Sequence, residues 1–290
     1  MSDFLITLAE ITLTMSAVIL LLLLLGPLLS RRYAIRWRYW AWLAVAARLL
    51  IPVNLSLPQA PVRLEAPSDR VVYTAPPAVS APAPVSTPAP AVTAAPVQPS
   101  AAPAPEPQAD APVLQPPVRS LTLSQVLFWG WLAGAVLLLL WYLAGYLRFR
   151  RYLRRWAKPL EPPRFLPALT RELGLTQPVR LLTCPGVKGP MMTGLLAPTV
   201  ILPEEALPRE DLWFILRHEL THFKRRDILY KTLLLCANLV HWFNPLTWAM
   251  LRAAEGDLER CCDHDVVKGL PDADRARYGQ VILDAVRAGR

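Results

Sequence analysis

Residues 217–222 read Arg-His-Glu-Leu-Thr-His and contain the pattern H-E-x-x-H, with histidines at positions 218 and 222. On an α-helix, His218 and His222 lie one turn apart and project from the same face. Two imidazoles at this spacing can take two positions around a tetrahedral zinc ion, and the glutamate between them can reach a water molecule at an open position. The pattern therefore predicts a zinc-dependent peptidase in which His218 and His222 bind Zn²⁺ and Glu219 is the catalytic base.

An acidic pattern, E-x-x-x-D, follows at residues 259–263. A catalytic zinc ion of this kind needs a third protein ligand, and a carboxylate on a downstream helix can supply it. Glu259 is the predicted third ligand. Asp263, one helical turn later, is predicted to accept a hydrogen bond from a ligand histidine and so fix its tautomer. Glu255 and Asp257 compete by position but lack this spacing. The alternative without a metal is an amphipathic helix with two histidines on its polar face, which explains neither the interposed glutamate nor the acidic pair.

The composition is typical of a membrane protein, because 53% of the residues are hydrophobic and the mean hydropathy is +0.30. Three apolar segments are candidate spans, at residues 4–29, 39–57 and 121–147. The first and third reach the roughly 20 residues needed to cross a bilayer, and the second is weaker. The first segment is expected to be a retained span rather than a signal peptide, because Arg31 and Arg32 follow it and no basic region precedes it.

Basic residues predict how these spans are oriented. One cluster lies between the first two spans and another follows the third: Arg31, Arg32, Arg36 and Arg38, then Arg148, Arg150, Arg151, Arg154, Arg155 and Lys158. The positive-inside rule places both clusters in the cytoplasm, with the N-terminus and residues 58–119 outside. The net charge of +9 is accounted for by these clusters beside anionic lipid, so direct nucleic-acid binding is not expected.

Residues 58–117 hold 17 of the 31 prolines, mixed with small residues. Such a segment cannot build a core and is expected to be extended or disordered. We interpret residues 58–119 as an extracytoplasmic tether, with binding of cell-wall material or a signal as the alternative. The predicted organisation is therefore two transmembrane helices with a basic cytoplasmic loop at 1–57, the tether, a third transmembrane helix at 120–148, and a cytoplasmic zinc metallopeptidase domain at 149–290.

The last of these segments alternates helix and strand signals. A helix is expected at 166–173, ended by Gly174, with short strands at 179–183 and 200–202, followed by the H-E-x-x-H helix from Pro208 to about Lys224. A small sheet there would offer an edge to an extended substrate. The fold class expected is mainly α, with multi-span membrane helices and an α+β zincin-like (gluzincin) metallopeptidase domain.

Residues 228–251 are apolar and could be read as a fourth span. A simple crossing would place Glu259 outside while His218 stayed inside, and the two could not share a metal. Asn244 is a good helix cap and Pro245 suits a first helical position. We therefore expect two helices that break near residue 244, with both ends cytoplasmic, packed in the domain or dipped into the near leaflet. His241 is expected to be a structural residue at this break.

The cysteines give no sign of a disulfide framework or of a thiolate zinc site. None of the four, at positions 184, 236, 261 and 262, lies in a segment predicted to be outside, and no C-x-x-C pair is present. The adjacent Cys261 and Cys262 are expected to be small core residues.

These motifs together resemble the BlaR/MecR family of antirepressor membrane metallopeptidases. The matching pieces are R-H-E-L-T-H at 217–222, R-R-D at 225–227, H-W-F-N-P at 241–245 and E-R-C-C-D at 259–263, with further similarity at 48–52 and 189–203. The resemblance covers about residues 4–57 and 121–270. It implies a protein of the bacterial plasma membrane with a cytoplasmic gluzincin domain. An outside signal would activate this domain to cleave a transcriptional repressor, and often the protein itself.

The chain also departs from that family pattern. Resistance receptors of this kind carry a penicillin-binding sensor after a further span, and these 290 residues contain neither that span nor an S-x-x-K motif. The sequence alone therefore gives no support for β-lactam sensing. Two rival hypotheses are a broad-specificity quality-control protease and a non-catalytic sensor or scaffold. The expected partners are a protein substrate, membrane lipid and, as an option, a second copy in a homodimer.

Overall fold

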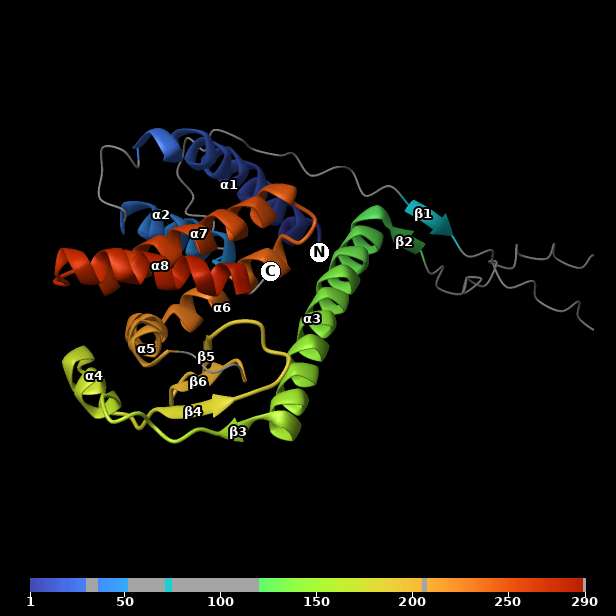
Figure 1. The fold of residues 1–290 in the computed structure, drawn as a ribbon. Coiled ribbons are helices and arrows are strands. Elements are labelled where there is room, and N and C mark those ends of the chain that lie inside the picture. Colours follow the sequence, from blue (N-terminus) through green and yellow to red (C-terminus); the bar gives the residue numbers. More distant parts are fainter. Residues whose placement is uncertain (30–35, 52–70, 75–119, 205–207, 289–290) are drawn as a thin grey trace, which may run out of the picture. The chain divides into compact units, whose positions relative to one another are not determined.

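A computed structural model describes residues 1–29, 36–51, 71–74, 120–204 and 208–288 (Figure 1). The chain divides into two compact units, one of Met1–Ala66 with Phe128–Arg290 and one of Pro67–Leu127. The elements, in chain order, are α1 (Ser2–Leu29), α2 (Arg36–Leu50), β1 (Val71–Thr74), β2 (Ser120–Thr122), α3 (Leu123–Trp156), β3 (Lys158–Pro159), α4 (Leu166–Leu173), β4 (Arg180–Thr183), β5 (Met191–Thr193), β6 (Thr199–Leu202), α5 (Arg209–Arg225), α6 (Asp227–Val240), α7 (Pro245–Val267) and α8 (Asp272–Ala288).

The smaller unit contains an antiparallel pair, in which β1 aligns Tyr73 with Leu121 and Thr74 with Ser120 of β2. The run Val-Val-Tyr-Thr at 71–74 is rich in β-branched and aromatic residues, which favour a strand. The prediction of a tether did not include this pairing. Apart from 71–74, the predicted tether lies outside the described residues.

In the larger unit a four-stranded sheet has the order β3-β4-β6-β5. Strand β4 is parallel to β6, whereas β3 and β5 are antiparallel to their neighbours and form the two edges. The buried strand β6 alternates its side chains between two faces. Val200 and Leu202 pack in a core with α4, α5 and α8, and Ile201 packs on the other face with Cys184 and Val187. The predicted helix at 166–173 and both predicted strands are confirmed.

A second core joins α1 and α2 to α6 and α7 (Figure 1). Its members are apolar side chains contributed by all four helices, among them Ile19, Trp42, Leu234 and Met250, each 1% exposed or less. The apolar segment 228–251 is therefore packed inside the unit. Because α6 and α7 also contact each other, they form a helical hairpin whose two outer ends lie at the same end of the bundle.

The hairpin turns at Asn244 and Pro245, which confirms the predicted break. The Asn244 side chain accepts a hydrogen bond from the Leu246 N–H, as a helix cap does, and Pro245 occupies the first turn of α7. His241 is fully buried and its ring contacts Thr12 Oγ1 of α1 at 2.8 Å and the Leu49 carbonyl of α2 at 3.1 Å. The prediction that His241 is structural at this break is confirmed.

Among the described residues, α1 and α3 are long and apolar enough to span a membrane. Much of their apolar surface is open to solvent, with Leu24 at 68% and Leu137 at 67% exposure, and apolar surface of this extent favours contact with lipid. Helix α2 has 15 residues, and residues 52–57 of the predicted second span lie outside the described residues. That span and the orientation of all three remain predictions.

Replacing Asn244 tests the hairpin turn. We expect Asn244→Ala to lower the free energy of unfolding by about 1–2 kcal/mol, because it removes the cap of α7 and the hydrogen bond that the Asn244 amide donates to Ser16 Oγ. The measurement is thermal unfolding of the detergent-solubilised chain. Asn244→Ser is the control, because it keeps a capping oxygen and should lose less. Equal losses would mean that the cap does not stabilise the turn.

Candidate active site

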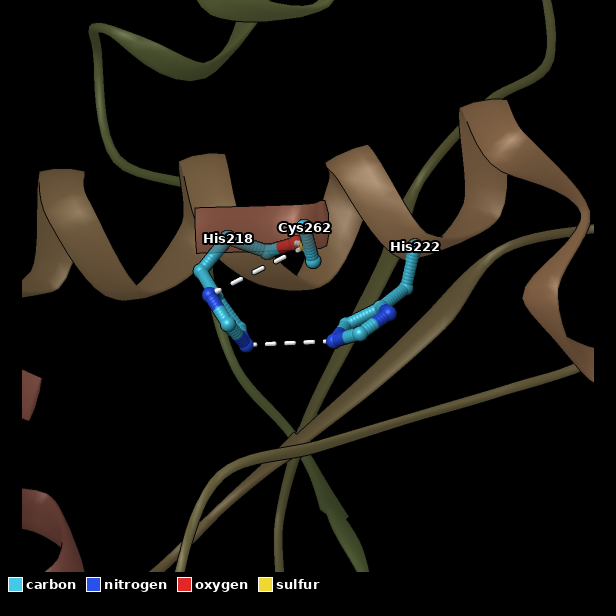
Figure 2. A group of neighbouring side chains, drawn as sticks. All are labelled: His218, His222 and Cys262. Atoms are coloured by element: carbon cyan, nitrogen blue, oxygen red, sulfur yellow. Dashed lines mark hydrogen bonds between the residues drawn. The ribbon is translucent and has the colours of Figure 1, made fainter. Parts of the chain in front are cut away.

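The two histidines of H-E-x-x-H meet on one face of α5 (Figure 2). His218 Nε2 lies 3.1 Å from His222 Nε2, and both rings are largely buried. This follows from local geometry, since residues four apart on a helix are neighbours. The structure therefore places the Nε2 atoms of the two predicted zinc ligands close enough to bind one ion.

The α6–α7 hairpin brings Glu259 to the same point. Glu259 Oε2 lies 3.2 Å from His222 Nε2 and 3.7 Å from His218 Nε2. Two ligand atoms of a tetrahedral zinc ion at about 2.0–2.1 Å are about 3.3 Å apart. The three observed separations, 3.1, 3.2 and 3.7 Å, lie around that value, so this donor set fits zinc.

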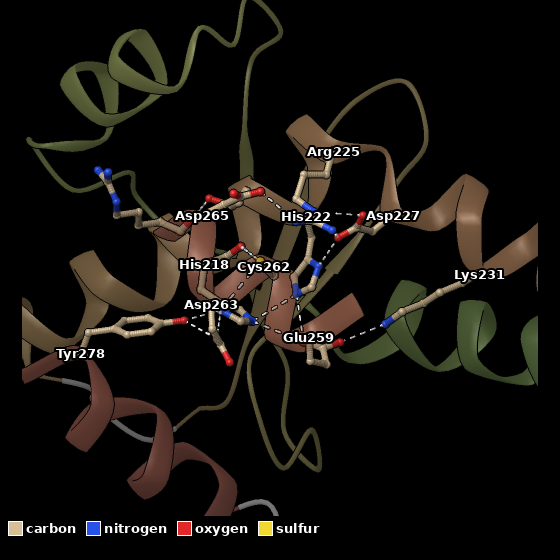
Figure 3. A network of polar contacts seen from close by, with 12 residues as sticks. His218, His222, Arg225, Asp227, Lys231, Glu259, Cys262, Asp263, Asp265 and Tyr278 are labelled. Carbon is tan, nitrogen blue, oxygen red and sulfur yellow. Dashed lines mark hydrogen bonds and ion pairs between the residues drawn. The ribbon is translucent and has the colours of Figure 1, made fainter. Parts of the chain in front are cut away.

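The outer nitrogen of His222 is held by Asp227 (Figure 3). His222 Nδ1 lies 2.7 Å from Asp227 Oδ2, and Asp227 is only 2% exposed. Asp227 starts α6 immediately after Arg226, whose φ of 59° turns the chain sharply at the end of α5. Asp227 belongs to the R-R-D motif of the family resemblance, but no role was predicted for it from the sequence. Its position just beyond the H-E-x-x-H helix is the feature that could have indicated a role beside the histidines.

The outer nitrogen of His218 is held by Tyr278 and Asp263. Tyr278 Oη lies 2.8 Å from His218 Nδ1 and donates a hydrogen bond of 2.6 Å to Asp263 Oδ1, which itself lies 3.4 Å from His218 Nδ1. The structure thus places Asp263 beside a histidine, with a tyrosine hydroxyl shared between them. Tyr278 belongs to α8 and no motif in the sequence pointed to it.

These contacts specify the protonation of both rings. Since Tyr278 donates to Asp263, its oxygen accepts from His218 Nδ1, and the Asp227 carboxylate accepts from His222 Nδ1. In neutral rings each Nε2 then carries a lone pair, and the two Nε2 atoms are 3.1 Å apart. Two lone pairs this close repel each other, so the nitrogens favour bound cations, either protons or a metal ion.

The pKa shifts of these side chains agree with this preference for cations. Burial would lower the pKa of His222, but hydrogen bonds with Asp227, Cys262 and Glu259 raise it to about 11. Burial would likewise lower the pKa of His218, but its hydrogen bonds, that with Asp263 first, hold it far above the usual range. For Glu259, burial would raise the pKa, and hydrogen bonds with both histidines instead lower it well below the usual range. Metal binding would replace protons at these nitrogens.

Cys262 is a rival donor, because its sulfur, His218 and His222 offer atoms within 4.8 Å of one another (Figure 2). Its Sγ lies 4.0 Å from His218 Nδ1 and donates to the His218 carbonyl at 3.7 Å. It is thus nearest to the ring nitrogen that Tyr278 already contacts. Cys262 also packs in the first core, as the sequence predicted. Glu259, which faces both Nε2 atoms, is the better third ligand.

Glu219 lies on α5 between the histidines and lines the same cavity. It is 9% exposed, and burial raises the pKa of its carboxyl, although the neighbouring charges of His218 and His222 oppose the increase. A general base works best when its pKa approaches the working pH, so this environment suits the predicted role.

The cavity has a volume of about 570 Å³ and is lined by both polar and apolar groups. Its walls include Gly189 to Met192 at and before the edge strand β5, and Ile215, Lys231 and Ile282 from three helices. Lys231 Nζ lies 3.3 Å from Glu259 Oε1. A second cavity, of about 430 Å³, shares Met192 and His222 with the first.

Comparison with known proteins identifies similar chains. A family model described as "BlaR1 peptidase M56" matches residues 6–290. "Regulatory protein BlaR1" of Bacillus licheniformis is 36% identical over 114 residues, which are 39% of this chain and 19% of that protein. "Methicillin resistance mecR1 protein" of Staphylococcus aureus and Staphylococcus epidermidis is 31% identical over 100 residues, which are 33% of this chain and 17% of that protein. The alignments cover less than a fifth of these curated relatives.

Two substitutions separate the rival third ligands. We expect Glu259→Gln to lose most bound zinc, because the carboxylate faces both Nε2 atoms, and Cys262→Ala to keep about one zinc ion per chain. The measurement is zinc content by atomic absorption after dialysis against a weak chelator. Retention of zinc by Glu259→Gln together with loss by Cys262→Ala would assign the third position to the thiolate.

Removing the charge of Asp227 tests the support of His222. We expect Asp227→Asn to weaken zinc affinity by about 10- to 100-fold, because an amide holds the Nδ1 proton less strongly and can rotate. Zinc affinity is measured by competition with a chromophoric chelator. The control is Asp272→Asn, which alters a carboxylate with a 98% exposed side chain on α8 and should match the wild type. Equal affinities in both variants would contradict a role for Asp227.

Proposed function

Because this chain belongs to the BlaR1 peptidase M56 family, we propose that it is a membrane-embedded zinc endopeptidase of bacterial signal transduction. One observation carries the proposal. Two histidine nitrogens and one carboxylate oxygen converge within 3.7 Å of one another, in a cavity that a buried glutamate also lines. Donors of these types at this spacing are those of a catalytic zinc site with an open fourth position.

Each residue then has a task in peptide hydrolysis. His218, His222 and Glu259 hold the zinc ion, whose Lewis acidity, when it is bound, activates water and polarises a carbonyl. Glu219 accepts the proton of the attacking water on its carboxylate and delivers it to the leaving amine. Asp227 and the Tyr278–Asp263 pair keep the Nδ1 protons in place, so that the Nε2 lone pairs stay directed at the metal.

The cavity walls suit a peptide substrate. Among the described strands β5 pairs with β6 alone, so its other edge can offer backbone groups to an extended chain. Residues Met191 and Met192 of this strand line the cavity that holds the histidines. We propose that the scissile segment adds to β5 as a further strand, with its backbone directed past His218 and Glu219. Apolar walls at Ile215 and Ile282 would exclude bulk water from the reacting bond.

The biological role proposed follows the relatives. Two of them are named as a regulatory protein and a methicillin-resistance protein. We propose that the substrate is a cytoplasmic transcriptional repressor, the chain itself, or both. The topology proposed is three spans in the plasma membrane, with the N-terminus outside and the peptidase domain in the cytoplasm. The two apolar helices α1 and α3 support a membrane location.

Replacing Glu219 tests the reaction. We expect Glu219→Gln to lower the rate of cleavage of the repressor or of the chain itself by at least about 100-fold, because the amide cannot accept a proton, while zinc stays bound. Cleavage by detergent-purified protein and zinc content are measured on the same samples. The control is Glu210→Gln, which makes the same chemical change at an exposed position of α5 and should cleave normally. Zinc binding without cleavage in the wild type, in the presence of its repressor, would favour the scaffold hypothesis.

A further inference from the structure

A chain of alternating charges leads away from the zinc ligands toward α2. Beyond His222, Asp227 receives hydrogen bonds from Arg225 Nε at 3.2 and 3.3 Å (Figure 3). Arg225 Nη1 donates to Asp265 Oδ2 at 2.8 Å. The second oxygen of Asp265 accepts from Arg36, the first residue of α2. The order is therefore His222, Asp227, Arg225, Asp265, Arg36, with contributions from α5, α6, α7 and α2.

Burial decreases steadily along this chain. The side chain of Asp227 is 2% exposed, and those of Arg225 and Asp265 are 15% and 20% exposed, whereas Arg36 is 55% exposed. Charge-assisted hydrogen bonds between buried partners are strong and directional, and those near the surface are weaker. The inner contacts therefore fix geometry, and the outermost contact is the one most easily broken and remade.

Helix α2 holds Arg225 by a second contact. The Arg225 guanidinium lies over the ring of Tyr39, 5.3 Å from its centroid, and Tyr39 stacks on Tyr230 of α6 with centroids 4.3 Å apart and planes 12° apart. Arg225 thus contacts Tyr39 on one side and Asp265 on the other, and Arg36 of α2 also binds Asp265. Since the first turn of α2 touches Arg225 both directly and through Asp265, a shift of α2 would displace this guanidinium.

The shared oxygen of Asp227 makes such a displacement relevant to the metal. Oδ2 of Asp227 accepts from His222 Nδ1 at 2.7 Å and also from Arg225 Nε at 3.2 Å. Moving the guanidinium would rotate this carboxylate and thereby turn the imidazole that it holds. Mutation of such outer partners of metal ligands commonly weakens metal binding.

We propose that Arg225, Asp265 and Arg36 are positioning residues that couple α2 to the metal-binding orientation of His222. The proposal rests on the zinc peptidase function put forward above and adds a route by which it is regulated. Residue 36 lies at the cytoplasmic end expected for the second membrane span. A displacement of that span would therefore reach the zinc site through three ion pairs, Arg36–Asp265, Asp265–Arg225 and Arg225–Asp227.

A double-mutant cycle tests the coupling. Zinc affinity is measured by chelator competition on the full detergent-solubilised chain for the wild type, Arg36→Gln, Arg225→Gln and the double variant. The d–d absorption of the Co²⁺-substituted protein, which reports ligand geometry, is recorded in parallel. We expect Arg225→Gln to weaken zinc binding about tenfold and Arg36→Gln about two- to fivefold. The double variant should bind as Arg225→Gln alone does, because Arg36 acts through Arg225.

Two further variants separate positioning from general stability. Arg36→Lys keeps the charge at the end of α2 and should restore most of the zinc affinity. Trp42→Phe removes a different contact between α2 and α7, the 2.8 Å hydrogen bond from Trp42 Nε1 to Asp257 Oδ2, which lies outside the chain of charges. This variant should lower the unfolding temperature but leave zinc affinity and the cobalt spectrum unchanged.

The outcomes are distinct. Three results would each overturn the coupling. The losses of zinc affinity could be additive in the double variant, Arg36→Gln could bind zinc as the wild type does, or Trp42→Phe could lose as much affinity as Arg36→Gln. None of these results would affect the peptidase assignment if the wild type cleaves its substrate. A wild type that binds zinc but cleaves nothing would count against the proposed function, and the affinity comparison would still decide whether α2 positions His222.

Discussion

Glu259 reaches the two histidines because the part of α7 that precedes it is about as long as α6 and runs back along it. Helix α6 has 14 residues, and Glu259 lies about the same distance along α7 from Pro245. The turn between them is anchored by Asn244, which caps α7 and binds Ser16, and by His241, which contacts α1 and α2. A longer or straighter segment would carry the carboxylate away from α5. The proposed zinc site depends on this antiparallel run of α7 along α6.

The returning carboxylate also creates an electrostatic imbalance. The carboxylates of Glu219, Glu259 and Asp263 line one cavity together with the two histidines. The ammonium group of Lys231 contributes a positive charge to the same cavity. Carboxylates gathered at a partly buried site are stable only if cations compensate them. Hydrogen bonds with Asp227, Cys262 and Glu259 outweigh burial and raise the pKa of His222 to about 11, so protonated histidines can supply this compensation. A divalent ion held by His218, His222 and Glu259 would provide the same compensation and displace protons from the histidines.

The helices expected in the membrane are part of the peptidase core. Trp42 of α2 and Ile19 of α1 are buried against the α6–α7 hairpin, which carries Asp227 at the start of α6 and Glu259 within α7. The helices that carry Asp227 and Glu259 therefore pack directly against helices expected in the membrane. This arrangement makes a coupling through Arg36 and Asp265 geometrically short, since α2 packs against both α6 and α7.

Features that depend on local spacing could be predicted from the amino-acid sequence alone. His218 and His222 are one helical turn apart, Gly174 ends α4 in the left-handed conformation, and Asn244-Pro245 starts α7, because each depends on residues a few positions apart. The requirement for a third ligand also pointed to Glu259. Only the tertiary structure brought Tyr278, Cys262 and the Arg225–Asp265 pair to the histidines. Their positions depend on how α7 and α8 pack against α5, and long-range packing of this kind leaves no periodic signal in a single sequence.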